Sequence, residues 1–168
     1  MILSAPVEFE GKPGRYCVYL MVDHDIQMAN GREIWGYPKK LGQIKMEEKN
    51  GVLISTVERA GFMLVRAGME LSQLVKPEPP VTGPMFNLKL IPSVKKDAPP
   101  DVMQLTSKTT ENVKVHKVYT GKATLEFGTS PVDPFHKIPI TEVMGGRYTN
   151  FDSTLPYGEV IYDYLKAK

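Results

Sequence analysis

The chain has 168 residues, a length that fits one domain with a substantial buried core. Hydrophobic residues make up 42% and charged residues 24%, a balance typical of globular proteins and not of disordered or membrane-spanning chains. The 21 basic and 19 acidic residues nearly cancel and are interspersed, which argues against nucleic acid as the main partner. We therefore expect a single domain over residues 1–168, with no nucleic-acid or membrane partner.

The elements expected along the chain are mostly short strands. Fourteen prolines and fourteen glycines divide the sequence into short segments, and most of these alternate polar and apolar residues as half-buried strands do. The predicted strands are residues 15–23, 43–48, 52–59, 62–71, 85–91, 102–108, 112–119, 122–127, 138–144 and 159–165. With no alternating βαβ pattern, the sequence favours an antiparallel sheet that closes or curls on itself over a doubly wound fold.

Turns and one helix complete the predicted elements. Asn50-Gly51 supplies the positive φ angles of a type I′ hairpin turn, and Ala60-Gly61 and Thr120-Gly121 are predicted as similar turns. Proline-rich residues 76–84 and 95–101 are expected to be extended loops. A short helix is expected at residues 23–33, capped by Asp23 or Asp25, with inward-facing residues Ile26, Met28 and Ala29.

Cysteine and histidine give no sign of a metal or disulfide framework. Cys17 is the only cysteine, so neither an intramolecular disulfide nor a cysteine-based zinc site can form. The three histidines, His24, His116 and His136, are far apart and lack ligand spacing. Residues 1–6 lack the basic-then-apolar order of a signal peptide. The simplest expectation is a cytoplasmic protein without a metal.

The most unusual segment is residues 31–42, which contain charges, aromatic residues and three glycines. Pro38 fixes its own φ angle and favours an extended Tyr37, so Lys39 follows a stiff dipeptide and its side chain has a defined direction. On the pattern alone, decoration of a surface turn is the favoured interpretation of the pair Lys39-Lys40.

This segment resembles the active-site signature of the acetoacetate decarboxylase family, in which Gly-Arg-Glu-(Ile/Leu) precedes aromatic-Pro-Lys-Lys-Leu. Residues 6–7, 11, 19–23, 88–92, 113–121 and 159–166 match the family in order and spacing. The resemblance implies a mainly β, closed or cone-like antiparallel barrel with few short helices. It also implies a family N-terminal segment, carrying an arginine and acidic residues, that has no counterpart here. We expect a shortened form of a working enzyme, with a natural variant lacking these residues as the alternative.

The resemblance assigns roles to the residues of the segment. Lys39 matches the lysine that forms a Schiff base, and Lys40 matches its assisting neighbour. Arg32 and Glu33 are expected to orient the loop or contact substrate. Tyr37 and Met21 could line an apolar pocket, although methionines on strands usually belong to the core.

A Schiff-base lysine must be neutral to attack a carbonyl carbon. A lysine with a pKa near 10.4 is only about 0.04% neutral at pH 7, and a pKa of about 7 requires roughly 4.6 kcal/mol of bias against the ammonium. Repulsion from Lys40 at about 8 Å gives only about 2 kcal/mol at an effective dielectric of 20. We therefore expect desolvation to dominate the pKa shift of Lys39.

The function implied is decarboxylation of acetoacetate or a similar β-keto acid through a lysine Schiff base, without metal or organic cofactor. A Schiff-base aldolase or dehydratase of the same family, or a non-catalytic small-molecule-binding protein, is the alternative. Exposed strand edges promote aggregation unless they are covered, so a homo-oligomer is also expected.

Overall fold

Residues 1–78 and 83–166 are described in a computed structural model of the protein. The chain divides into two compact units, each assembled from segments that are far apart in the sequence. The first unit comprises Met1–Lys40, Val81–Asn112 and Ser153–Lys168, and the second comprises Leu41–Pro80 and Val113–Asp152. The predicted single domain, closed barrel and homo-oligomer stay predictions.

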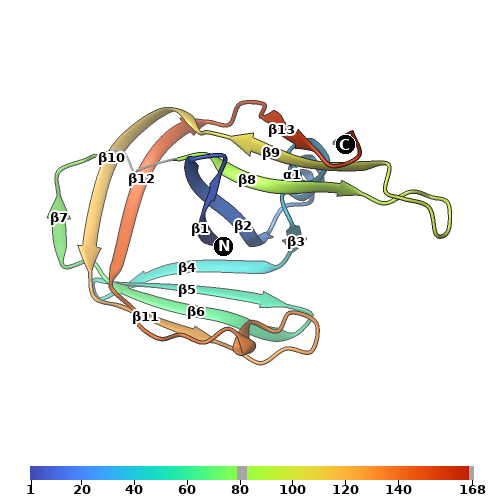
Figure 1. Ribbon diagram of the computed structural model, residues 1–168. Coiled ribbons are helices and arrows are strands. Elements are labelled where there is room, and N and C mark those ends of the chain that lie inside the picture. The colour runs from blue at the N-terminus through green and yellow to red at the C-terminus, as the bar shows by residue number, and fades with distance from the viewer. Residues whose placement is uncertain (79–82, 167–168) are drawn as a thin grey trace. The chain divides into compact units, whose positions relative to one another are not determined.

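The first unit is built around a sheet with the strand order β1-β2-β8-β9-β13, to which β3 is added by pairing with β2 (Figure 1). Its strands are β1 (Ile2–Phe9), β2 (Lys12–Val22), β3 (Lys39–Leu41), β8 (Met85–Ile91), β9 (Val102–Lys108) and β13 (Glu159–Asp163). Strands β2 and β8 run parallel, an exception to the predicted antiparallel pairing, which β1-β2, β8-β9 and β9-β13 follow. A long connection joins these two strands in place of a hairpin, so their directions need not oppose.

Helix α1 (Asp25–Trp35) lies against this sheet and contacts β2, β8 and β9 (Figure 1). Met28 and Trp35 pack on a buried cluster whose members are Cys17, Leu20, Val22 and Tyr37. The Thr106 hydroxyl donates a hydrogen bond to the Trp35 carbonyl at 2.7 Å, which ties the end of the helix to β9. The first unit thus holds the last turn of α1 firmly against the sheet.

The beginning of α1 differs from the prediction. The N-cap residue is His24, which makes no side-chain capping hydrogen bond, and the Asp25 carboxylate instead accepts from the neighbouring Ile26 N–H at 2.7 Å. Ile26 was expected to face inward but is 62% exposed. Because the helix begins two residues later than predicted, the face that packs on the sheet is the one carrying Met28 and Trp35.

The second unit contains a four-stranded sheet with the order β11-β6-β5-β4, and most of a three-stranded sheet with the order β12-β10-β7. The strands are β4 (Gln43–Lys49), β5 (Val52–Arg59), β6 (Phe62–Glu70), β7 (Gln73–Val75), β10 (Glu111–Gly121), β11 (Ala123–Phe127) and β12 (Gly146–Thr154). A 3₁₀ turn, η1 (Phe135–Lys137), precedes β12. The buried Asp133 carboxylate pairs with Arg59 at 3.0 Å and fixes this connection to β5.

The fold is mainly β with one α-helix among the described residues, as the sequence predicted. The Asn50-Gly51 and Ala60-Gly61 turns are confirmed, with positive φ angles at all four residues. Thr120-Gly121 is not a turn, because Thr120 pairs with Gln73 inside β10. The loop at residues 95–101 is confirmed, whereas residues 79–82 of the other predicted loop lie outside the described residues.

The strand prediction was wrong at a few places. Residues 138–144 form no strand, and Pro139 removes a backbone donor there. Strands β1, β3, β7 and β12 were missed. Pro6 obscured β1, which tolerates a proline because it lies at the edge of its sheet. No described helix is long and apolar enough to cross a membrane.

The junction between α1 and β8 yields a stability prediction. Gly36 ends α1 with φ +76°, and a Cβ there would lie 2.5 to 2.7 Å from the Lys89 backbone. Gly11 has the same φ angle, but its Cβ would meet nothing within 4 Å. Gly11→Ala should therefore cost about 1–2 kcal/mol from backbone strain alone, and Gly36→Ala should cost roughly 1–3 kcal/mol more from overpacking.

Urea unfolding of both variants measures these free energies. Equal losses of stability in Gly36→Ala and Gly11→Ala would show that α1 does not pack on β8 as closely as described.

Candidate active site

Lys39 begins β3, and three residues, Gly36 to Pro38, separate it from the end of α1. The Tyr37 N–H donates to the Gly31 carbonyl at 3.0 Å, and the Lys39 N–H donates to the Tyr37 carbonyl at 2.7 Å. The Arg32 guanidinium donates to the Lys39 carbonyl at 3.1 Å. Since these bonds fix the backbone on both sides of Pro38, the direction of the Lys39 side chain is set by the helix end.

The Lys39 side chain lies across α1 at the one position where the helix has no side chain. Its Nζ donates to the Gln27 carbonyl at 2.9 Å. A Cβ on Gly31 would overlap the Cδ and Cε of Lys39 and would lie 2.6 Å from its Nζ. Gly31 therefore provides the space that the lysine occupies.

The two neighbouring lysines separate at their ends. The Lys39 Nζ lies 5.6 Å from the centre of the Tyr37 ring, whereas the Lys40 Nζ lies 5.9 Å from the centre of the Tyr19 ring. Alternation along a strand sends successive side chains to opposite faces. Lys40 is thus directed away from the position that the Lys39 amine occupies.

Burial lowers the pKa of the Lys39 amine. A Cys17 thiolate would oppose this shift, but burial also raises the pKa of the Cys17 thiol to about 11. The thiol is therefore neutral near pH 7 and contributes no charge. Within the described part of the chain no carboxylate forms an ion pair with Lys39, so desolvation is the main influence on its protonation.

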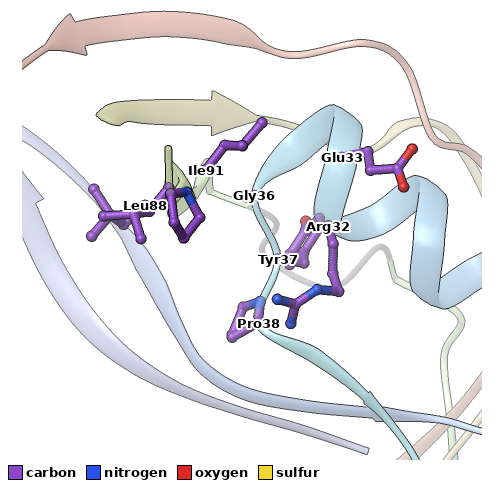
Figure 2. A pocket seen from close by; sticks show the side chains of 9 residues that line it. Arg32, Glu33, Gly36, Tyr37, Pro38, Leu88 and Ile91 are labelled. Carbon is purple, nitrogen blue, oxygen red and sulfur yellow. The ribbon is translucent and has the colours of Figure 1, made fainter. Parts of the chain in front are cut away.

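A cavity of about 410 Å³ lies beside the end of α1 (Figure 2). Its lining includes three predicted site residues, Arg32, Glu33 and Tyr37, together with apolar residues of β8. Figure 2 shows Arg32 on the side of α1 that faces Tyr37 and Pro38, whereas the Glu33 carboxylate points away from them. The residues that line the cavity are Arg32, Glu33, Gly36, Tyr37, Pro38, Leu88, Leu90, Ile91 and Pro92.

Known proteins resemble the chain over nearly its whole length. The profile of the family "Acetoacetate decarboxylase (ADC)" matches residues 1–165. The chain is 33% identical to the acetoacetate decarboxylase of Clostridium botulinum (strain Eklund 17B / Type B), over 97% of this chain and 67% of the relative. This chain belongs to the acetoacetate decarboxylase family. It spans about two thirds of the length of such relatives.

Solved structures of other proteins share the fold of this chain. The crystal structure of acetoacetate decarboxylase from Legionella pneumophila has a TM-score of 0.90 and 31% identity, covering 96% of this chain and 66% of that one. A structure of the enduracididine biosynthesis enzyme MppR, complexed with the condensation product of pyruvate and imidazole 4-carboxaldehyde, has a TM-score of 0.82 and 24% identity. It covers 97% of this chain and 65% of that one, and shows a shared fold.

The predicted site residues of this family member do not all line the cavity. Arg32, Glu33 and Tyr37 line the cavity, whereas Lys39 and Met21 are not among its lining residues. Met21 is buried in β2. The hydrogen bond from Arg32 to the Lys39 carbonyl fits an orienting role for Arg32.

Sequence reasoning missed several neighbours of Lys39 and of Tyr37. Gly31 had a detectable signal, because a glycine inside a helix costs about 1 kcal/mol and usually has a packing reason. The others had none, since their proximity depends on strand register or, for Gln27 of α1, on how the Lys39 side chain packs against the helix. The missed residues are Cys17, Gln27, Gly31, Asn87 and Lys108.

The packing of the Lys39 side chain against Gly31 can be tested by adding a side chain at position 31. In Gly31→Ala the flexible end of Lys39 must move away from α1, which should separate Nζ from the Gln27 carbonyl and expose it to water. Labelling of Lys39 by an amine-specific reagent should then have its midpoint at a higher pH than in the unchanged protein. Peptide mapping across a pH series measures this midpoint.

The matched control is Asn30→Ala, at an exposed position of the same helix. This variant should leave the Lys39 midpoint unchanged. Stability of Gly31→Ala should change by no more than about 1 kcal/mol, because alanine favours the helix while the lysine shifts. An unchanged Lys39 midpoint in Gly31→Ala would contradict the described packing.

Proposed function

We propose that this chain decarboxylates acetoacetate or a similar β-keto acid through a Schiff base on Lys39. The observation that carries the proposal is the half-buried Lys39 amine, whose pKa is lowered by burial and whose Nζ is held by the Gln27 carbonyl. Family membership, and the 33% identity to a protein named acetoacetate decarboxylase, support this reaction class.

The neutral Lys39 amine has the form needed for the first step. One of its N–H groups donates to the Gln27 carbonyl, which leaves the nitrogen lone pair free to attack a ketone carbon. Uptake of a proton and loss of water from the adduct then give an iminium ion. Lowering the pKa raises the fraction of amine that can react near pH 7.

The iminium ion supplies the electron sink for bond breaking. The electron pair of the carbon–carbon bond moves to the iminium nitrogen, which releases carbon dioxide and leaves a neutral enamine. Protonation of the enamine carbon and addition of water release the ketone and restore Lys39. Both charges of the reactant disappear in the decarboxylation step, so a site of low polarity, such as the one beside Tyr37 and Cys17, suits this chemistry.

Lys40 is assigned at most an assisting role. Burial is the leading cause of the lowered Lys39 pKa, and the Lys40 ammonium lies over a different aromatic ring. A charge about 8 Å away has a modest effect even before screening by salt.

A related Schiff-base reaction is the second candidate. The structure of MppR that shares this fold contains a condensation product of pyruvate with an aldehyde. Such chemistry would use the same lysine with different acid and base groups around the bound substrate.

Trapping with borohydride tests the proposal. Incubation with acetoacetate and borohydride should give a reduced adduct on the peptide that contains Lys39, and acetoacetate alone should release carbon dioxide. Lys39→Ala should abolish both. Lys40→Ala, the matched control at the adjacent lysine, should reduce carbon dioxide release by no more than about tenfold, a barrier change of about 1.4 kcal/mol.

The alternatives give different outcomes in the same assay. An adduct with pyruvate or with β-keto acids, formed without any carbon dioxide, would favour condensation or dehydration chemistry over the proposal. If none of these compounds forms an adduct on Lys39, the result would favour a non-catalytic small-molecule-binding protein.

A further inference from the structure

Two buried polar side chains near Lys39 are not used by the Schiff-base chemistry. Lys108 is the last residue of β9 and is 6% exposed. Asn87 in β8 is 1% exposed, and its Nδ2 and Oδ1 make no hydrogen bond of regular geometry among the described residues, although the side chain approaches the Tyr37 hydroxyl. Within the same described part of the chain, Lys108 forms no ion pair with a carboxylate. Burying such groups without partners is costly.

Strand register places both side chains on one face of the sheet. Asn87 lies opposite Thr106, and Lys108 is two residues beyond Thr106 on the same strand. Residues two apart on a strand share a face, and diagonal neighbours on paired strands lie within reach of a long side chain. Because the Thr106 hydroxyl bonds to the Trp35 carbonyl, this is the face that α1 covers.

The same face borders Lys39 and Tyr37. Met85, which lies opposite Lys108, packs on the buried cluster that contains Cys17 and Tyr37. The Asn87 side chain acts on the Tyr37 hydroxyl as a weak hydrogen-bond partner, without the geometry of a regular hydrogen bond, and partly offsets the rise that burial causes in the tyrosine pKa. Burial lowers the pKa of Lys108, and the nearby charge of Lys39 lowers it further. The two lysines thus share one environment without a paired acidic group among the described residues.

We infer that Lys108 and Asn87 form a carboxylate subsite, which receives the carboxylate of the β-keto acid while its ketone carbon reacts with Lys39. This inference rests on the proposed function. The Lys108 ammonium and the Asn87 Nδ2 are hydrogen-bond donors, and a carboxylate has two acceptor oxygens. Binding would supply the buried cation with a counter-charge and the buried amide with a partner.

The subsite should contribute to substrate binding more than to bond breaking. The carboxylate carries its full charge in the bound substrate and loses that charge as carbon dioxide leaves. An interaction that is strongest with the ground state lowers KM and does not raise kcat. Lys108 is therefore a binding residue for the intact β-keto acid, and the ketone product does not need it.

Three probes separate the two halves of the substrate. Acetone has the ketone without the carboxylate, acetate has the carboxylate without the ketone, and acetoacetate has both. In Lys108→Met, KM for acetoacetate should rise by about tenfold or more while kcat does not fall. In the same variant, borohydride trapping of acetone on Lys39 should stay within about twofold of the unchanged protein. Lys108→Arg keeps the positive charge, so its KM for acetoacetate should lie much closer to that of the unchanged protein than the KM of Lys108→Met does.

The control variants test charge and shape. Lys96→Met removes an exposed lysine of the same unit and should leave KM unchanged. Asn87→Leu, which keeps a similar volume, should raise KM in the same direction as Lys108→Met. An unchanged KM in Lys108→Met, or an equal loss of acetone trapping, would overturn the subsite.

Acetate provides a readout that needs no Schiff base. With ¹³Cε-labelled lysine, titration with acetate should shift the Lys108 resonance, assigned from its absence in Lys108→Met, and should leave the Lys96 resonance in place. If acetone and acetoacetate form no adduct on Lys39 but acetate still shifts Lys108, the proposed function fails and the anion site stands. No shift at Lys108 would overturn the subsite whatever the outcome at Lys39.

Discussion

The central constraint of this structure is the missing side chain at Gly31, which lets the Lys39 side chain lie directly against α1. A Cβ at this position would occupy the space of the lysine Cδ and Cε. Partial burial of the amine and the hydrogen bond to the Gln27 carbonyl follow from that placement. Gly36 helps to fix the position of α1, because the absence of a side chain there lets the end of the helix pack closely against the backbone of β8.

Two effects compete over the protonation state of Lys39. Desolvation disfavours the ammonium, whereas the Gln27 carbonyl accepts a hydrogen bond that the ammonium makes more strongly than the amine. The net direction is a lowered pKa. Lys108 is a buried cation in the same environment, so an arriving carboxylate relieves the cost of burying the Lys108 ammonium.

The sequence predicted much of this arrangement, because local patterns determine strands, hairpin turns and the segment around Pro38. The turn at Asn50-Gly51 was predicted correctly because these two residue types readily adopt the positive φ angles that the turn requires. Lys108 could not be predicted, because alternation along β9 does not reveal that α1 covers the face on which it lies. Asn87 became relevant only through its register with Thr106. The parallel pairing of β2 with β8 likewise depends on segments far apart in the chain.

The titration of Lys39 tests the account most directly. With ¹³Cε-labelled lysine, the resonance lost in Lys39→Arg reports the midpoint of this one amine. A pKa lowered by folding means that the unfolded chain binds more protons between the folded and unfolded values, so stability should rise with pH through that interval. The account predicts a Lys39 midpoint below the value of about 10.4 for a freely hydrated lysine. A midpoint at or above that value would contradict it.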